Sequence, residues 1–136
     1  MVSMHAVYDG AKKCTLTHDS SGAVIRSDAP TDIGGDGSSF SPTDLVGSAL
    51  AGCILTTMAM FAERHDVALD GAAARVTKEM TTEAPRRIAR LAVAIALPAA
   101  NVPVDFRGKL EKIAVSCPVH KSLHPDIEAP VTFTYA

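Results

Sequence analysis

The sequence predicts one domain that mixes helices with antiparallel strands, and two observations lead to this prediction. Residues 41–66 form an apolar stretch with the length and spacing of a long helix. Short stretches typical of strands lie on both sides of it, in residues 5–26 and again in residues 74–97. With 136 residues, 47% hydrophobic and 21% charged, the chain is long enough to bury one core. We therefore expect a single domain over residues 1–136.

The long helix is predicted to begin at Ser41. Ser41 can cap the first free amides, Pro42 suits the first helical position, and Asp44 lies three residues after the cap. Small and apolar residues then cover almost every side of the helix, with Gly47 and Gly52 among them. A helix that is apolar nearly all round is buried on all sides, and glycines let another backbone come close. One chain of 14.2 kDa is too small to cover such a helix, so we expect a homodimer.

Local patterns predict the remaining elements. Residues 28–40 are rich in Gly, Pro, Asp and Ser and should form a loop that leads into the long helix. Residues 103–115 have the spacing of a shorter amphipathic helix. The expected strands lie around residues 5–7, 14–18, 23–26, 74–82, 87–97 and 129–135, the first three being antiparallel and the next two forming a long hairpin.

Composition and charge exclude several classes of protein. The net charge of −2, the lack of a basic cluster and the scarcity of aromatic residues argue against nucleic-acid binding. No basic N-terminal segment precedes an apolar run, and small and polar residues interrupt the long helix. We therefore expect no membrane span and a cytoplasmic location.

Three cysteines, at positions 14, 53 and 117, are the candidate reactive residues. An odd number without zinc-type pairing argues against a secreted disulfide framework and favours reduced thiols. Cys14 falls in an expected strand, where a single cysteine is usually a small core residue, so we assign it no chemistry. Cys53 lies near the middle of the long helix.

Cys117 precedes Pro118 at the expected start of another short helix. The helix dipole and free amides at such a position lower the pKa of a thiol. Lys121 and a charged His120 would lower the pKa further, so the residues alone favour a thiolate at Cys117.

Two interpretations of Cys53 and Cys117 follow from the residues. In the first, one thiolate attacks a peroxide oxygen, becomes a sulfenic acid and condenses with the other thiol to a disulfide. In the second, the two cysteines are unrelated, and the cysteine count alone favours this simpler interpretation.

A metal site is a third possibility for the same segment. Cys117, His120 and His124 are spaced to share one helical face, with Cys53 or Asp126 as a fourth ligand. A proline interrupts that face and the chain has no Cys-x-x-Cys pair. We therefore predict neither a metal nor a cofactor.

Three segments together resemble a known family. They are residues 27–37 (Ser-Asp-Ala-Pro-Thr-Asp-Ile-Gly-Gly-Asp-Gly), 41–53 (Ser-Pro-Thr-Asp-Leu-Val-Gly-Ser-Ala-Leu-Ala-Gly-Cys) and 116–123 (Ser-Cys-Pro-Val-His-Lys-Ser-Leu). In this order and spacing they resemble the OsmC/Ohr hydroperoxide-resistance family over almost the whole chain. The Gly-Gly-Asp-Gly loop before Ser-Pro is similar to a less characterised, OsmC-like branch.

The resemblance implies a fold and an activity. The fold would be α+β, with a long central helix and shorter helices packed on antiparallel sheets in an intertwined homodimer. The activity would be that of a thiol-dependent peroxidase for organic hydroperoxides, in which Cys53 attacks the peroxide, Cys117 resolves the product and a thiol reductant of the dihydrolipoyl type resets the pair. This order of attack differs from the one that the helix start at Cys117 favours.

The groups that would activate Cys53 depart from the family pattern. Active members use an arginine from the N-terminal half and a glutamate ten positions before the cysteine. Thr43 occupies that position here, and its neighbour Asp44 is rotated by about 100° around the helix. Arg26 is the only arginine before the helix. The alternative function is therefore a weakly active or inactive OsmC-like protein that binds a small apolar or electrophilic ligand.

Overall fold

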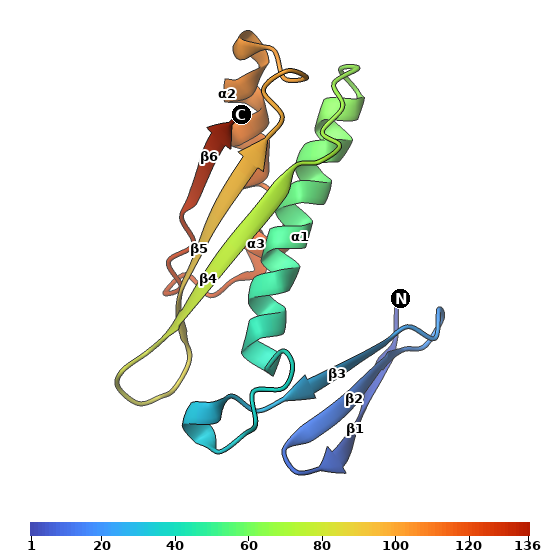
Figure 1. The fold of residues 1–136 in the computed structure, drawn as a ribbon, viewed down its shortest axis with the longest axis vertical. Helices are drawn as coiled ribbons and strands as arrows, with labels where there is room; N and C mark the ends of the chain where they lie inside the picture. The colour runs from blue at the N-terminus through green and yellow to red at the C-terminus, as the bar shows by residue number, and fades with distance from the viewer. The chain divides into compact units, whose positions relative to one another are not determined.

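The computed structural model describes residues 1–136, which form two compact units, residues 1–46 and 47–136. The single-domain assignment stays a prediction. Helices and strands occur in separate runs, so the predicted α+β class is confirmed (Figure 1). In chain order the elements are β1 (Met4–Gly10), β2 (Lys13–His18), β3 (Val24–Asp28), the short 3-10 helix η1 (Thr31–Ile33), α1 (Pro42–Glu63), β4 (Ala73–Met80), β5 (Ile88–Leu97), α2 (Val104–Ala114), α3 (Pro118–Ser122) and β6 (Val131–Tyr135).

The first unit is built on an antiparallel sheet in the order β1-β2-β3, as the sequence predicts. Apolar side chains remain exposed on this sheet, including Met4, Tyr8 and Ile25. A hollow of about 400 Å³ lies among residues of all three strands and the turn before β3. A three-stranded sheet with a solvated apolar surface has little core of its own, so this surface is a candidate for burial by another molecule.

The loop after β3 is anchored by the buried carboxylate of Asp28. Its Oδ2 atom accepts hydrogen bonds from the backbone N of Ser38 at 3.0 Å and from the Ser38 hydroxyl at 2.6 Å. These hydrogen bonds, with a nearby Lys13 ammonium, lower the pKa of Asp28 to about 2. The Lys13 ammonium also donates a hydrogen bond to the Asp36 carboxylate at 2.6 Å, so β2 holds the middle of this loop as well as its start.

Helix α1 starts as predicted. The backbone N of Ser41 donates to the Asp44 carboxylate at 2.8 Å, and the backbone N of Asp44 donates to the Ser41 hydroxyl at 3.1 Å. This reciprocal pair satisfies two donors that a helix start would otherwise leave unpaired. The helix ends at Glu63, three residues before the predicted end, which makes it about 33 Å long at 1.5 Å per residue.

The second unit places α1 along the sheet formed by β4, β5 and β6 (Figure 1). One stripe of α1 is buried, and its members recur at three- and four-residue steps: Gly47, Leu50, Ile54, Met58 and Ala62. Leu91, Val93 and Ile95 of β5 contribute to the same core. Helix α2 adds Leu110 and Ala114.

The sheet of the second unit corrects one prediction. Strands β4 and β5 form the expected antiparallel hairpin, but β6 pairs with β5 in parallel, with Val93 opposite Val131. The predicted packing on antiparallel sheets is therefore wrong for this strand pair. The chain between β5 and β6 contains α2 and α3. Such a crossover brings the chain back to the end of the sheet where β5 began.

The prediction that α1 is buried on all sides is not met within one chain. Met60 is 54% exposed, and Ala49, Gly52 and Thr56 are exposed as well. A Cβ atom on Gly47 would lie 3.4 Å from Leu91, whereas a Cβ on Gly52 would meet nothing within 4 Å. By length and composition alone α1 could cross a membrane, but this is weak evidence because core helices pass the same test.

Replacing Gly47 by leucine tests the packing of α1 against β5. A larger side chain must push against Leu91 and Val76 in a filled core. We expect the free energy of unfolding to fall by about 1–3 kcal/mol or more. Urea denaturation followed by circular dichroism measures the change, and an unchanged midpoint would contradict this packing.

Candidate thiol site

The structure brings the side chains of Cys53 and Cys117 together. Cys53 lies in the middle of α1, half-buried at the edge of the core. Cys117 comes directly before α3 and is fully buried. The two side chains lie close enough for Cys53 to raise the pKa of the Cys117 thiol. Residues far apart in the sequence thus form one dithiol site.

Cys117 is the N-cap residue of α3, which confirms the predicted helix start. Pro118 occupies the first helical turn, and the Cys117 sulfur accepts a hydrogen bond from the backbone N of His120 at 3.3 Å. The sulfur therefore takes the place of the hydroxyl or carboxylate oxygen that usually caps a helix.

Burial raises the pKa of the Cys117 thiol above its ordinary value. Interaction with the neighbouring Cys53 side chain raises this pKa further. The backbone amides of His120 and Val119 lower the pKa, but they do not outweigh burial. The expectation that the helix start favours a thiolate at Cys117 is therefore wrong. Desolvation in the core is stronger than the effect of a five-residue helix.

The rings of His120 and His124 both interact with backbone groups. The Nε2 atom of His120 lies 3.2 Å from the carbonyl oxygen of Ala129, and Nδ1 of His124 accepts a hydrogen bond from the backbone N of Asp126 at 3.1 Å. The spacing that suggested a metal site thus directs the two rings to different backbone groups. No group of three or more His, Cys, Asp or Glu residues is placed to hold a metal ion.

The other residues singled out in the sequence have different surroundings. Cys14 lies in β2 of the first unit, opposite Tyr8 of β1 and Ser27 of β3. Asp44 belongs to the cap of α1, and the Thr43 hydroxyl lies 3.2 Å from the Ser41 hydroxyl in the same turn.

Arg26 lies in β3, and its carbonyl oxygen accepts a hydrogen bond from Ser39 at 2.7 Å. This contact fastens the backbone of β3 to the loop before α1. It involves no atom of the guanidinium group, so it gives Arg26 no catalytic role.

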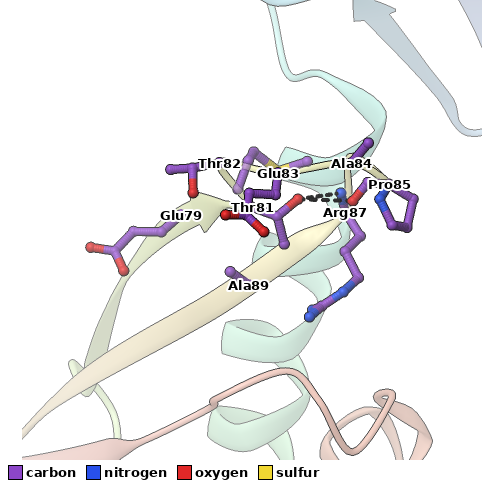
Figure 2. A pocket seen from close by; sticks show the side chains of 9 residues that line it. Glu79, Thr81, Thr82, Glu83, Ala84, Pro85, Arg87 and Ala89 are labelled. Atoms are coloured by element: carbon purple, nitrogen blue, oxygen red, sulfur yellow. Dashed lines mark hydrogen bonds between the residues drawn. The ribbon is translucent and has the colours of Figure 1, made fainter.

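A separate hollow of about 680 Å³ lies at the turn between β4 and β5. Figure 2 shows Thr81 at its centre: the Thr81 hydroxyl donates to the carbonyl of Pro85 and accepts from the backbone N of Arg87, both at 3.0 Å. Neither cysteine lines this hollow. The Thr81 hydroxyl closes the turn, and the hollow is separate from the dithiol site.

Comparison with known proteins identifies the family of the chain. The model of the OsmC-like protein family matches residues 35–131, a range that contains both cysteines of the site. The chain belongs to the OsmC-like family. No curated protein is detectably similar to it in sequence.

Solved structures extend the family likeness to the fold. The chain is 34% identical to an osmotic stress induced and detoxification response protein from Psychrobacter arcticus, with a TM-score of 0.92 over 98% of this chain and 96% of that one. An OsmC-like protein from Mycoplasma pneumoniae is 18% identical, with a TM-score of 0.82 over 100% and 97% of the two chains. The organic hydroperoxide resistance protein OsmC from Legionella pneumophila is 14% identical, with a TM-score of 0.75 over 98% and 96%.

The part that His120 plays in the site is not evident from the sequence, where its ring suggested a charge or a metal ligand near Cys117. In the structure the backbone N of His120 donates a hydrogen bond to the Cys117 sulfur, and its ring bonds the carbonyl oxygen of Ala129. The helix-start signal at Cys117 and Pro118 could have indicated the first bond, since residue N3 commonly donates to a cap. No local signal indicates the second bond.

The burial and raised pKa of Cys117 predict slow alkylation. In the reduced protein at pH 7, we expect iodoacetamide to modify Cys117 more slowly than Cys14 or Cys53, because only the thiolate reacts and the sulfur is covered. Raising the pH should continue to accelerate the reaction of Cys117 above the ordinary thiol pKa of about 8.5. Pulsed alkylation with peptide mass spectrometry measures these rates. Equal rates at Cys117 in the folded and urea-unfolded protein would contradict the prediction.

Proposed function

We propose that this OsmC-like protein is a thiol-dependent peroxidase that reduces organic hydroperoxides through Cys53 and Cys117. The observation that carries the proposal is the proximity of a partly buried cysteine, Cys53, to a fully buried one, Cys117. Adjacent thiols of this kind can form a disulfide after one of them is oxidised. The OsmC name, given to a hydroperoxide resistance protein from Legionella pneumophila, supports the same substrate class.

Cys53 is the attacking thiol in this proposal. Cys53 is only partly buried, whereas Cys117 is fully buried and its thiol has a raised pKa. The Cys53 thiolate attacks the terminal oxygen of the hydroperoxide and the O–O bond breaks. The leaving alkoxide takes a proton and departs as an alcohol, and Cys53 becomes a sulfenic acid.

Cys117 is the resolving thiol. It loses its proton and attacks the sulfenic sulfur of Cys53, so that an S–S bond forms and the hydroxyl group leaves as water. The two sulfurs must approach to about 2 Å for this bond. An external dithiol of the dihydrolipoyl type then reduces the disulfide, and its own two sulfurs become oxidised in exchange.

A homodimer is part of the same proposal. The exposed side of α1 carries small and apolar residues, including Ala49, Gly52 and Met60, and the sheet β1-β2-β3 exposes further apolar side chains. A second copy of the chain would cover these surfaces and remove their apolar area from water. It would also enclose the partly buried Cys53 in an apolar setting, which suits an organic hydroperoxide.

Oxidation by an organic hydroperoxide should form a Cys53–Cys117 disulfide. We expect one equivalent of tert-butyl hydroperoxide to lower the intact mass by two hydrogens and to leave one free thiol, at Cys14. Cys53→Ser should abolish hydroperoxide consumption, Cys117→Ser should stop at a sulfenic acid on Cys53 that over-oxidises with excess peroxide, and Cys14→Ser should behave like the wild type. Intact-mass and peptide-mass spectrometry provide the measurement.

Two results would contradict these roles. Full turnover by Cys53→Ser would exclude Cys53 as the attacking thiol, and a disulfide that includes Cys14 would exclude the proposed pair. If all three thiols survive a modest excess of hydroperoxide, the second candidate function is favoured: a small apolar or electrophilic ligand is bound without turnover. The cap role of Asp44 and the presence of Thr43 at the usual glutamate position are the observations that keep this candidate open.

A leucine at Gly52 should weaken the proposed dimer. A Cβ at Gly52 would meet nothing within 4 Å in its own chain, so we expect the added bulk to clash with a second copy, at a cost of at least about 1–3 kcal/mol. Gly108→Leu is a matched control, because Gly108 is also a helical glycine with open space around it and lies on α2. Sedimentation at micromolar concentration should show a wild-type dimer, a dimer for Gly108→Leu and dissociation for Gly52→Leu. A folded wild-type monomer would contradict the homodimer.

A further inference from the structure

The short helix α3 directly follows Cys117, the proposed resolving thiol, and has few hydrogen bonds of its own. It contains five residues, Pro118–Ser122, and an isolated helix of this length is unstable in water. Its position must therefore be fixed by contacts with the rest of the unit. Because Cys117 caps this helix, whatever fixes α3 also fixes the Cys117 sulfur.

The ring of His120 supplies such a contact. Nε2 of His120 lies 3.2 Å from the carbonyl oxygen of Ala129. A carbonyl oxygen only accepts, so Nε2 must carry the hydrogen of this bond. Both the neutral ring with hydrogen on Nε2 and the protonated ring can donate in this way, so the bond does not require a charged histidine.

Ala129 is a firm anchor because the chain on both sides of it is bonded to β5. The backbone N of Leu91 donates to the carbonyl of Glu128 at 2.8 Å, and the backbone N of Val93 donates to the carbonyl of Pro130 at 2.9 Å. Successive carbonyl groups of an extended chain point to opposite sides. The Ala129 carbonyl therefore points away from β5, where the His120 ring can reach it.

One residue thus connects the buried thiol to the sheet. The backbone N of His120 bonds the Cys117 sulfur at 3.3 Å, and its ring bonds the chain that leads into β6. We propose that His120 is a positioning residue that holds the Cys117 sulfur against Cys53 for disulfide formation. This inference rests on the proposed function, since it concerns the second step of the peroxidase cycle.

The proposal predicts a separation of the two chemical steps. His120→Ala removes the ring bond, so α3 should sample other positions and the condensation should slow by roughly five- to tenfold, the effect of about one hydrogen bond. The attack of Cys53 on the hydroperoxide should keep its wild-type rate, because His120 contacts the Cys117 side of the site. Slower condensation should also increase over-oxidation of Cys53 with excess peroxide.

Two further variants distinguish this role from general support of the fold. His120→Gln keeps an N–H donor of similar reach and should restore most of the condensation rate. His124→Ala is the matched control: its ring is largely exposed and contacts Asp126 on its own loop, so neither step should change.

The experiment oxidises each reduced variant with one equivalent of tert-butyl hydroperoxide and quenches it at successive times. Intact mass separates sulfenic acid, which gains one oxygen, from disulfide, which loses two hydrogens. We expect transient sulfenic acid to accumulate in His120→Ala and not in His120→Gln or His124→Ala. A wild-type condensation rate in His120→Ala, equal slowing of both steps, or no rescue by His120→Gln would overturn the proposal.

A second oxidant separates this inference from the proposed function. Diamide accepts two electrons and two protons from a pair of thiols: it first adds to one, and the other then displaces it to form the disulfide. If hydroperoxide leaves Cys53 unchanged but diamide joins Cys53 to Cys117 more slowly in His120→Ala, the peroxidase assignment fails and the role of His120 stands. If diamide forms the disulfide at the same rate in both proteins, or forms none, the role of His120 is refuted.

Discussion

Burial of the Cys117 thiol against Cys53 is the interaction on which the site depends. It requires the middle of α1 and the start of α3 to meet at the edge of one core. Because Cys117 is desolvated, its pKa is raised and its thiol stays protonated at neutral pH. The contact therefore joins a sheltered, neutral thiol to a more accessible one, and this difference gives the two cysteines distinct chemical roles.

Helix α1 has two kinds of surface, and the glycines illustrate the difference. The Gly47 side is filled by Leu91 and Val76, whereas the Gly52 side is open. Cys53 lies at the boundary between these two surfaces: it is partly buried against the core, and the neighbouring exposed surface consists of small residues. In the proposed dimer a second copy would complete the surroundings of Cys53, so assembly and reactivity would be coupled.

Local signals in the sequence predicted the parts of the fold that depend on neighbouring residues. The Ser41 and Asp44 cap, the Cys117 helix start and the two hairpins are of this kind. The parallel direction of β6 depends on a crossover through two helices and could not be read from a short pattern. The raised pKa of Cys117 depends on burial by distant residues, so the helix-start argument gave the wrong direction. The pairing of Cys53 with Cys117 came from the family resemblance, since cysteine spacing alone left it open.

The rate at which Cys53 reacts with a hydroperoxide tests the central claim most directly. A variant with serine at positions 14 and 117 leaves Cys53 as the only thiol, and stopped-flow mixing with cumene hydroperoxide at pH 7 gives its second-order rate constant. The peroxidase account predicts a rate constant well above that of free cysteine, and a higher value for cumene hydroperoxide than for hydrogen peroxide. A rate constant equal to that of free cysteine for both peroxides would contradict the account.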